Sequence, residues 1–348
     1  MLLLACYAPN TPWEYGLSGL RPRDQAVFGP VPSRRLGLSL GVDLLWPKTC
    51  TLDCLYCELG PTTVLTARRG RFRDAQAVLA EVRARLAELA APPDFITLAG
   101  SGEPTLHLDL GLVLAGLREL SPARLAVLTN ATLVSDAQVR AELCLADVLV
   151  PSLDAVSPRV FRRLNRPAPG LDPAAMIEGL VALRRQFSGQ MWLEILLVAG
   201  LNDSDEELAA LKAAARTIAP DKVQINTVVR PPAVAGIKPL EHGRLQEIAA
   251  SFPLHAEVIA PPRGQAQGDR GVLAAQVVEM TRRRPCTCED IEAMSGLGPQ
   301  ETRRLLRELL AQGRLREEPF DRQVFYRGVE ATAPGGAPDP STPNGGCK

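Results

Sequence analysis

Two hydrophobic patterns alternate along the first 260 residues. Short apolar runs, typical of strands buried on both faces, alternate with longer segments whose apolar positions recur every three or four residues, as in helices. The predicted strands are Leu38–Leu45, Phe95–Ala99, Leu125–Thr129, Val148–Leu153, Trp192–Val198 and Val223–Val228, and the predicted helices lie near 74–90, 109–119, 135–144, 172–187 and 204–218. This alternation predicts an α/β fold with a parallel sheet and helices outside it.

The number of repeating units limits the architecture. Six strand–helix units are too few for a complete eight-stranded barrel. A partial (β/α)6 TIM-like barrel and a doubly wound sheet both fit the pattern. In either architecture, polar side chains at the carboxyl ends of the strands meet in one place, so we expect the chemistry there.

A second, smaller unit is predicted after residue 270. Residues 263–270 are polar and contain two glycines, which indicates a linker; three short helical patterns follow at 272–283, 287–295 and 299–312, and then two strands around a turn. Three helices followed by a hairpin is the order of a winged helix. The expected divisions are an irregular segment 1–25, the barrel 26–262, the linker 263–270, a winged helix-turn-helix domain 271–328 and a disordered tail 329–348. Domains joined by such a linker are expected to fold independently.

Composition and charge narrow the class of protein. The 348 residues are 46% hydrophobic and 22% charged, which supports a large core and excludes disorder throughout. Thirty-nine basic residues balance 39 acidic ones, so the whole chain is not a nonspecific nucleic-acid binder. No apolar run reaches the roughly 18 residues of a membrane helix, and the first residues make a poor signal peptide. We therefore expect a cytoplasmic protein without a membrane span.

The strongest local signal is a group of three cysteines. The segment Cys50-Thr-Leu-Asp-Cys54-Leu-Tyr-Cys57 follows the first predicted strand. Three thiolates on one short loop suit three corners of a [4Fe–4S] cluster and leave the fourth iron open to a substrate or cofactor. The alternatives are a zinc site with a distant fourth ligand and three free core cysteines. The other five cysteines form no second ligand set, which disfavours an auxiliary cluster.

This motif resembles that of the radical S-adenosylmethionine (SAM) superfamily. Those enzymes carry C-x3-C-x-aromatic-C after the first strand of a partial barrel, and Tyr56 stands at the aromatic position. The similarity covers roughly residues 26–260. Phe28-Gly-Pro-Val-Pro-Ser-Arg-Arg-Leu-Gly, with Lys48-Thr-Cys and Tyr56-Cys-Glu, resembles a branch similar to wyosine-type Fe–S oxidoreductases, which modify tRNA. The resemblance implies a [4Fe–4S] cluster, SAM, and a reductant such as flavodoxin or ferredoxin.

The resemblance also implies roles for single residues. Ser101-Gly102-Glu103 occupies the place of a Gly-Gly-Glu segment that binds the methionine amino group of SAM, with Ser in place of the first Gly. Small polar residues at the ends of the third and fourth strands suit the ribose hydroxyls and the carboxylate. The candidate SAM-binding residues are Tyr56, Ser101, Gly102, Glu103, Asn130, Ser152, Asp154 and Asn165, and the candidate metal ligands are Cys50, Cys54 and Cys57. Ordinary turn and cap chemistry is the competing interpretation of the polar residues.

Three further polar residues stand in or after the last strands. Glu194 and Asn226 interrupt apolar strands, so they either line the barrel interior or face a helix with a hidden partner. Arg230 lies just beyond the sixth strand. It either meets an anionic group of the substrate or of SAM, or it is a solvated loop residue.

The sequence is compatible with several kinds of ligand for the predicted winged helix. Residues 270–328 contain 11 Arg and 9 acidic residues, a net charge of only +2. Nucleic acid, a peptide or protein, and a second copy of the chain are all compatible with that charge. Two functions remain: a radical SAM enzyme that takes hydrogen from an RNA base, peptide or metabolite, and a non-catalytic Fe–S redox-sensing regulator that binds DNA through the winged helix. The oligomeric state is not indicated.

Overall fold

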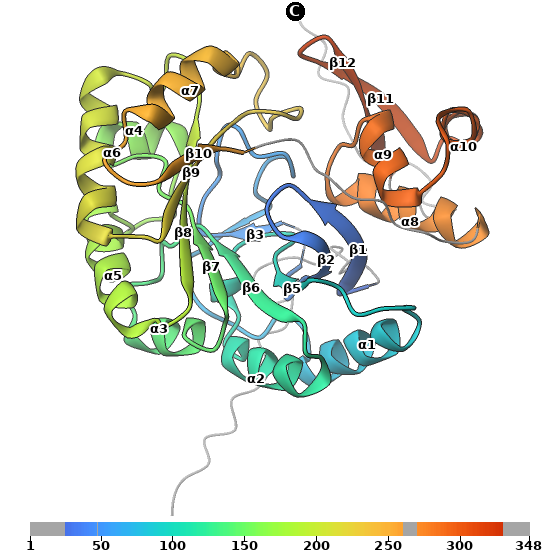
Figure 1. The fold of residues 1–348 in the computed structure, drawn as a ribbon, viewed down its shortest axis with the longest axis horizontal. Helices are drawn as coiled ribbons and strands as arrows, with labels where there is room; N and C mark the ends of the chain where they lie inside the picture. Colours follow the sequence, from blue (N-terminus) through green and yellow to red (C-terminus); the bar gives the residue numbers. More distant parts are fainter. Residues whose placement is uncertain (1–24, 47, 260–269, 330–348) are drawn as a thin grey trace, which may run out of the picture.

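The computed structural model describes residues 25–46, 48–259 and 270–329 (Figure 1). Almost all of the segments expected to be an irregular start, a linker and a disordered tail lie outside these ranges. Within the described part of the chain, no helix has the length and apolar character needed to cross a bilayer.

One eight-stranded sheet forms the centre of the molecule, and its strands lie side by side in chain order. They are β1 (Val27–Ser33), β2 (Gly37–Val42), β5 (Phe95–Leu98), β6 (Arg124–Thr129), β7 (Val148–Pro151), β8 (Gln190–Leu197), β9 (Lys222–Thr227) and β10 (Ala256–Val258). All pairings are parallel except that of β1 with β2. A doubly wound sheet reverses its strand order at a switch point. The unbroken order therefore makes this fold a partial TIM-like barrel, as predicted.

Helices cover the outer side of the curved sheet (Figure 1). They are α1 (Ala75–Ala87), α2 (Leu110–Leu120), α3 (Ala137–Leu143), α4 (Pro158–Leu164), α5 (Pro173–Gln186), α6 (Asp205–Ile218) and α7 (His242–Ala250). Local capping fixes where several begin: the Asp74 carboxylate accepts the Ala77 amide at the start of α1, and Ser204 caps α6, whose first turn is acidic. The five helices predicted from periodicity are confirmed.

The hydrophobic pattern did not indicate β1, α4, α7 or β10. Strand β1 contains two prolines, which a sheet tolerates only at an edge, and β1 indeed pairs with β2 alone. Strand β10 has three half-buried residues and hence almost no apolar signal. With β10 the sheet gains a seventh parallel strand beyond the six predicted.

The C-terminal unit, residues 270–329, has the predicted order of three helices and a hairpin. Its elements are α8 (Arg270–Arg283), α9 (Cys288–Ser295), α10 (Pro299–Ala311), β11 (Leu315–Phe320) and β12 (Gln323–Gly328). Figure 1 shows it beside β1 and β2. Its apolar core, which includes Val277 and Ile291, also takes in Val31 of β1.

Buried ion pairs join this unit to the barrel. Arg283 of α8 lies 3.0 Å from Asp43, at the end of β2, and these side chains are only 3% and 2% exposed. The Arg283 guanidinium also lies over the Phe28 ring, 4.3 Å from its centroid. The sequence did not indicate these contacts between the two units, because a polar linker says nothing about the contacts made beyond it.

Candidate active site

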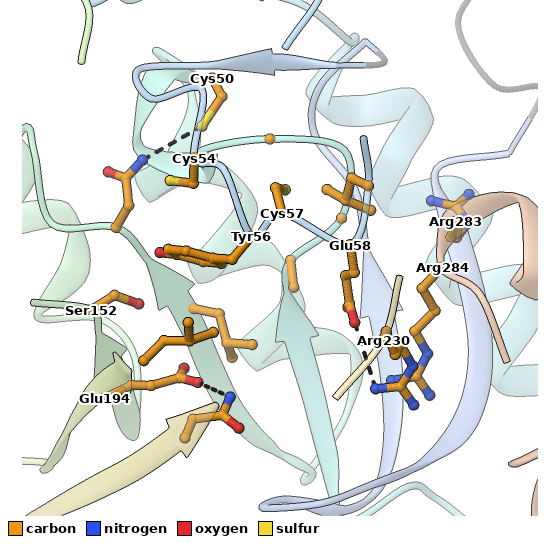
Figure 2. Close-up of a pocket in the computed structure, with 18 of the residues that line it drawn as sticks. Cys50, Cys54, Tyr56, Cys57, Glu58, Ser152, Glu194, Arg230, Arg283 and Arg284 are labelled. Carbon is orange, nitrogen blue, oxygen red and sulfur yellow. Dashed lines mark hydrogen bonds and ion pairs between the residues drawn. The ribbon is translucent and has the colours of Figure 1, made fainter. Parts of the chain in front are cut away.

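A cavity of about 400 Å³ lies at the carboxyl ends of the parallel strands (Figure 2). Its lining comes from the cysteine loop, from the ends of β5 to β9, from the β1–β2 hairpin and from α8. Of the candidate residues, those that line it are Cys50, Cys54, Tyr56, Cys57, Gly102, Glu103, Asn130, Ser152 and Asp154. Ser101 and Asn165 lie behind this lining.

The cysteine loop is held by backbone pairing on both sides. Strand β3 (Thr49–Cys50) pairs with β4 (Val64–Leu65), and Thr49 also forms a bridge with Gly102. A Cβ on Gly102 would lie 1.6 Å from the Thr49 carbonyl oxygen. Glycine is required there because the segment after β5 packs directly on the cysteine loop.

The three thiols are free and sit among hydrogen-bond donors. The side-chain amides of Asn130 and Asn165 lie 3.5 Å from the sulfurs of Cys50 and Cys54 respectively. Burial raises the pKa of the Cys50 thiol to about 12, and burial with the neighbouring Cys57 also raises the pKa of Cys54. The cavity therefore disfavours the thiolate forms of Cys50 and Cys54.

Lys48 supplies one positive charge beside the thiols. Burial alone would lower its pKa, but Cys57 above all, and also Cys50 and Cys54, more than offset this and raise it. Its ammonium donates to the Gly60 carbonyl oxygen at 2.5 Å, which fixes the side chain within the loop. A lysine in this position stabilises negative charge on the sulfurs.

The donor set fits an iron–sulfur cluster better than a single ion. Within the described ranges, no group of three or more His, Cys, Asp or Glu side chains is arranged to hold one metal ion. A cubic cluster needs its thiolates at separate corners rather than around one point. Three sulfurs on one cavity wall, with two amide donors and a lysine, suit such corners, whereas the zinc interpretation lacks a converging ligand set.

Asp154 is fixed by three donors. Its Oδ2 accepts from the Tyr56 hydroxyl and from Asn165 Nδ2 at 3.1 Å, and its Oδ1 accepts from the Leu196 amide at 2.9 Å. Burial raises the pKa of Asp154 to about 6. Asn165 thus positions Asp154 and Tyr56 rather than lining the cavity, while the Ser152 side chain faces the cavity (Figure 2).

The Glu103 carboxylate is buried, and protein donors take up most of its hydrogen-bonding capacity. Its Oε1 accepts from the amide and hydroxyl of Thr105 and from the Thr129 hydroxyl, while within the described ranges its Oε2 accepts only from the Asn130 amide at 2.6 Å. Burial raises the pKa of this carboxyl group. Glu103 therefore braces two strand ends, and Oε2 is the oxygen with capacity left for a ligand.

Ser101 has a role that differs from that of a glycine. Its backbone amide and hydroxyl both donate to Asp43 Oδ2, at 3.0 and 2.5 Å. Asp43 is the carboxylate that pairs with Arg283 of the C-terminal unit. The substituted position is thereby tied to α8.

Arginines from the β1–β2 turn reach the interior of the barrel, which sequence reasoning missed. Arg35 Nη2 lies 2.6 Å from Glu194 Oε1, and Arg34 Nη1 lies 3.3 Å from Asn226 Oδ1. Glu194 and Asn226 line the cavity, which is the first of the two alternatives given above, and Asn226 also donates to Glu194 at 2.7 Å. The arginine pair was visible in the segment after Ser33, but its partners lie more than 150 residues away.

Arg230 is neither a solvated loop residue nor free for an anion. Its side chain is 5% exposed, and its guanidinium lies 2.9 Å from Asp290 of α9 and 3.5 Å from Glu58. Its Nε donates to the Pro285 carbonyl oxygen at 2.9 Å. Arg230 therefore joins the C-terminal unit to the rim of the cysteine loop.

Known proteins resemble this chain in sequence. Residues 45–211 match the family model described as Radical SAM superfamily. A UPF0026 protein of Synechocystis sp. is 39% identical over 212 residues, which cover 59% of this chain and 76% of that protein. A protein of Brachyspira hyodysenteriae described as GTPase Obg is 30% identical over 87% of this chain, but the chain spans only 45% of its length.

Solved structures resemble it less closely. SuiB of Streptococcus suis, solved with S-adenosylmethionine bound, is 17% identical with a TM-score of 0.48, over 63% of this chain and 50% of that one. The sequence relationships are the stronger ones. The cofactors of a radical SAM domain are a [4Fe–4S] cluster and SAM, and its enzymes draw electrons from an external reductant. The chain belongs to the UPF0026 family, and it carries a radical SAM domain over residues 45–211.

Proposed function

We propose that this protein is a radical SAM enzyme whose cluster is held by Cys50, Cys54 and Cys57 and whose substrate gives up a hydrogen atom in the cavity beside them. The observation that carries this proposal is that three free thiols and polar residues from five strand ends line one cavity. When bound, the cluster and SAM supply a 5′-deoxyadenosyl radical that abstracts hydrogen from the substrate.

Residues of the chain have separate tasks in this proposal. Lys48 offsets the negative charge of the thiolates, and the Asn130 and Asn165 amides donate to two of them. Glu103 accepts a hydrogen bond from the ammonium group of SAM through its less occupied oxygen, Oε2. Ser152 and Asp154 accept from the ribose hydroxyls.

Exclusion of water is the second requirement. A carbon radical is protected when the site is closed and apolar away from its few polar contacts. The cavity wall includes Leu52, Leu128 and Leu196 from the barrel, and Met280 from α8. The C-terminal unit thus forms part of the wall that keeps solvent and competing hydrogen donors out.

The identities of the substrate and of the reductant are part of this proposal. We propose flavodoxin or ferredoxin as electron donor, and as substrate an RNA base, a peptide or a metabolite. A winged-helix grip on RNA or peptide would use the faces of the C-terminal unit that point away from the barrel. A non-catalytic regulator would need the cysteines and the three helices, but it would have no use for the polar strand ends around the cavity.

The test is formation of 5′-deoxyadenosine. Anaerobically reconstituted protein is reduced with dithionite in the presence of SAM, and 5′-deoxyadenosine and methionine are quantified by chromatography. The wild type should form both. Cys54→Ala should form neither, and Cys144→Ala, which alters a thiol outside the cavity, should match the wild type. A wild-type protein that holds a cluster but leaves SAM intact would refute the proposed function.

A further inference from the structure

The cavity has two chemically different ends. The thiol end is formed by Cys50, Cys54 and Cys57; the arginine end is formed by Arg34, Arg35, Arg230 and Arg284. Figure 2 shows the thiols on one side of Tyr56 and Glu58, and Arg230 and Arg284 together beyond Glu58. The proposed function uses the thiol end and gives the arginine end no role.

The arginine end holds more guanidinium groups than there are carboxylates that pair with them in the described part of the chain. Arg35 pairs with Glu194, and Arg230 pairs with both Asp290 and Glu58. Four guanidinium groups thus face three carboxylates, an excess of one positive charge. In a partly buried site an uncompensated charge is costly, so a ligand of opposite charge is stabilised there.

Of the four arginines at this end, Arg34 is one of two that have no acidic partner among the described residues. Among the described residues, its only side-chain hydrogen bond is to the neutral Asn226 amide oxygen at 3.3 Å, and no carboxylate lies within ion-pair distance. Burial, and then the neighbouring charges of Arg230 and Arg35, lower the pKa of Arg34 to about 10. The group remains charged at neutral pH and lies in an excess of positive charge.

Arg284 is the second arginine at this end that has no acidic partner among the described residues. Its Nε is buried and has no hydrogen-bond partner within the described part of the chain. Figure 2 shows its side chain beside that of Arg230, whose guanidinium lies 3.5 Å from Glu58. Arg34 and Arg284 therefore both line the cavity, and neither has an acidic partner among the described residues.

We propose that Arg34 and Arg284 bind an oxyanion of a small substrate, a phosphate or a carboxylate, and so hold its reacting C–H bond toward the thiol end of the cavity. Guanidinium groups present paired N–H donors that match the oxygens of either anion. A small substrate is favoured because Arg284 directly follows the last residue of α8, so the C-terminal unit itself encloses this end of the cavity. The inference rests on the proposed function and adds the class of substrate.

The test measures binding of simple anions to the SAM-loaded holoenzyme. Sodium phosphate and sodium acetate are titrated separately by calorimetry in low-salt chloride buffer, with wild type, Arg34→Gln and Arg284→Gln. The matched control is Arg303→Gln, which removes an exposed arginine of α10 outside the cavity. At least one anion should bind the wild type, and each cavity variant should weaken it roughly ten- to hundredfold, as loss of a charge-assisted hydrogen bond does.

The outcomes separate the possible interpretations. Tighter binding of phosphate identifies a phosphate-bearing substrate, and tighter binding of acetate a carboxylate. No binding of either anion, or equal binding in all four proteins, would overturn the proposal. So would a loss of SAM affinity in the two cavity variants, which would assign the arginines to the SAM carboxylate. A wild type that binds the anion but forms no 5′-deoxyadenosine would refute the proposed function and leave the anion site standing.

Discussion

The buried pair of Arg283 and Asp43 makes a quantitative prediction about the C-terminal unit. Arg283→Met keeps most of the side-chain stem and removes the guanidinium, which contacts Asp43 at 3.0 Å and the Gln25 carbonyl oxygen at 2.7 Å. Removal of one partner of a buried pair costs roughly 3–5 kcal/mol, because the other charge stays buried. Asp43 keeps three donors, two from Ser101 and one from the Leu45 amide, so we expect the lower end, about 3 kcal/mol.

The assay is urea unfolding followed by circular dichroism, with Arg304→Met as the matched control. Arg304 pairs with Glu308 on α10, but these side chains are 69% and 53% exposed, so the control should lose at most about 1 kcal/mol. Adding Asp43→Asn to Arg283→Met should restore part of the loss, because the orphaned charge is removed. If Arg283→Met costs no more than the control, the unit does not dock on the barrel as described.

Three further predictions concern the site. Replacing Cys54 by Ala should abolish stable cluster assembly, measured as iron and sulfide content after anaerobic reconstitution, while Cys144→Ala should retain the wild-type content; a stable cluster in the first variant would refute the ligand assignment. Glu103→Gln should weaken SAM binding about ten- to hundredfold and should cost less stability than Glu103→Ala, because the Gln oxygen can still accept from the Thr105 and Thr129 donors, whereas Ala leaves every donor without an acceptor; equal SAM affinity in the Gln variant contradicts the role given to Oε2. A chain truncated after Ile259 should lose stability and SAM cleavage together, since Arg283 and Met280 are removed from the cavity wall; wild-type SAM cleavage by the truncated chain would favour independent domains.

Local features of this fold could be predicted because their causes are local. Strands such as β6 are buried on both faces, so their apolar runs stand out in the sequence, and the order of strands and helices then fixes a parallel sheet. The cysteine motif is equally local, because its three sulfurs come from eight consecutive residues. All three were expected at one site, and they line one cavity.

Long-range pairings could not be predicted in the same way. Arg35 and Glu194 are 159 residues apart, and Arg283 and Asp43 are 240 apart. Each residue alone is compatible with a solvated surface position, and only the packed fold brings it to a partner. Gly102 shows a related limit: the resemblance implied a part in SAM binding, and the close approach that the structure shows is to the Thr49 carbonyl oxygen.

The coupling through Asp43 gives the C-terminal unit a direct connection to the candidate SAM site. One oxygen of this carboxylate accepts from the Ser101 amide, the Ser101 hydroxyl and Arg283 of α8. Arg284, which directly follows the last residue of α8, lines the arginine end of the cavity. An anion that moves Arg284 would therefore also shift the end of α8 and, through Arg283 and Asp43, the position of Ser101. Substrate binding and the position of the Ser101–Glu103 segment are expected to be linked energetically, and by reciprocity SAM should change the affinity for the anion by the same factor as the anion changes the affinity for SAM.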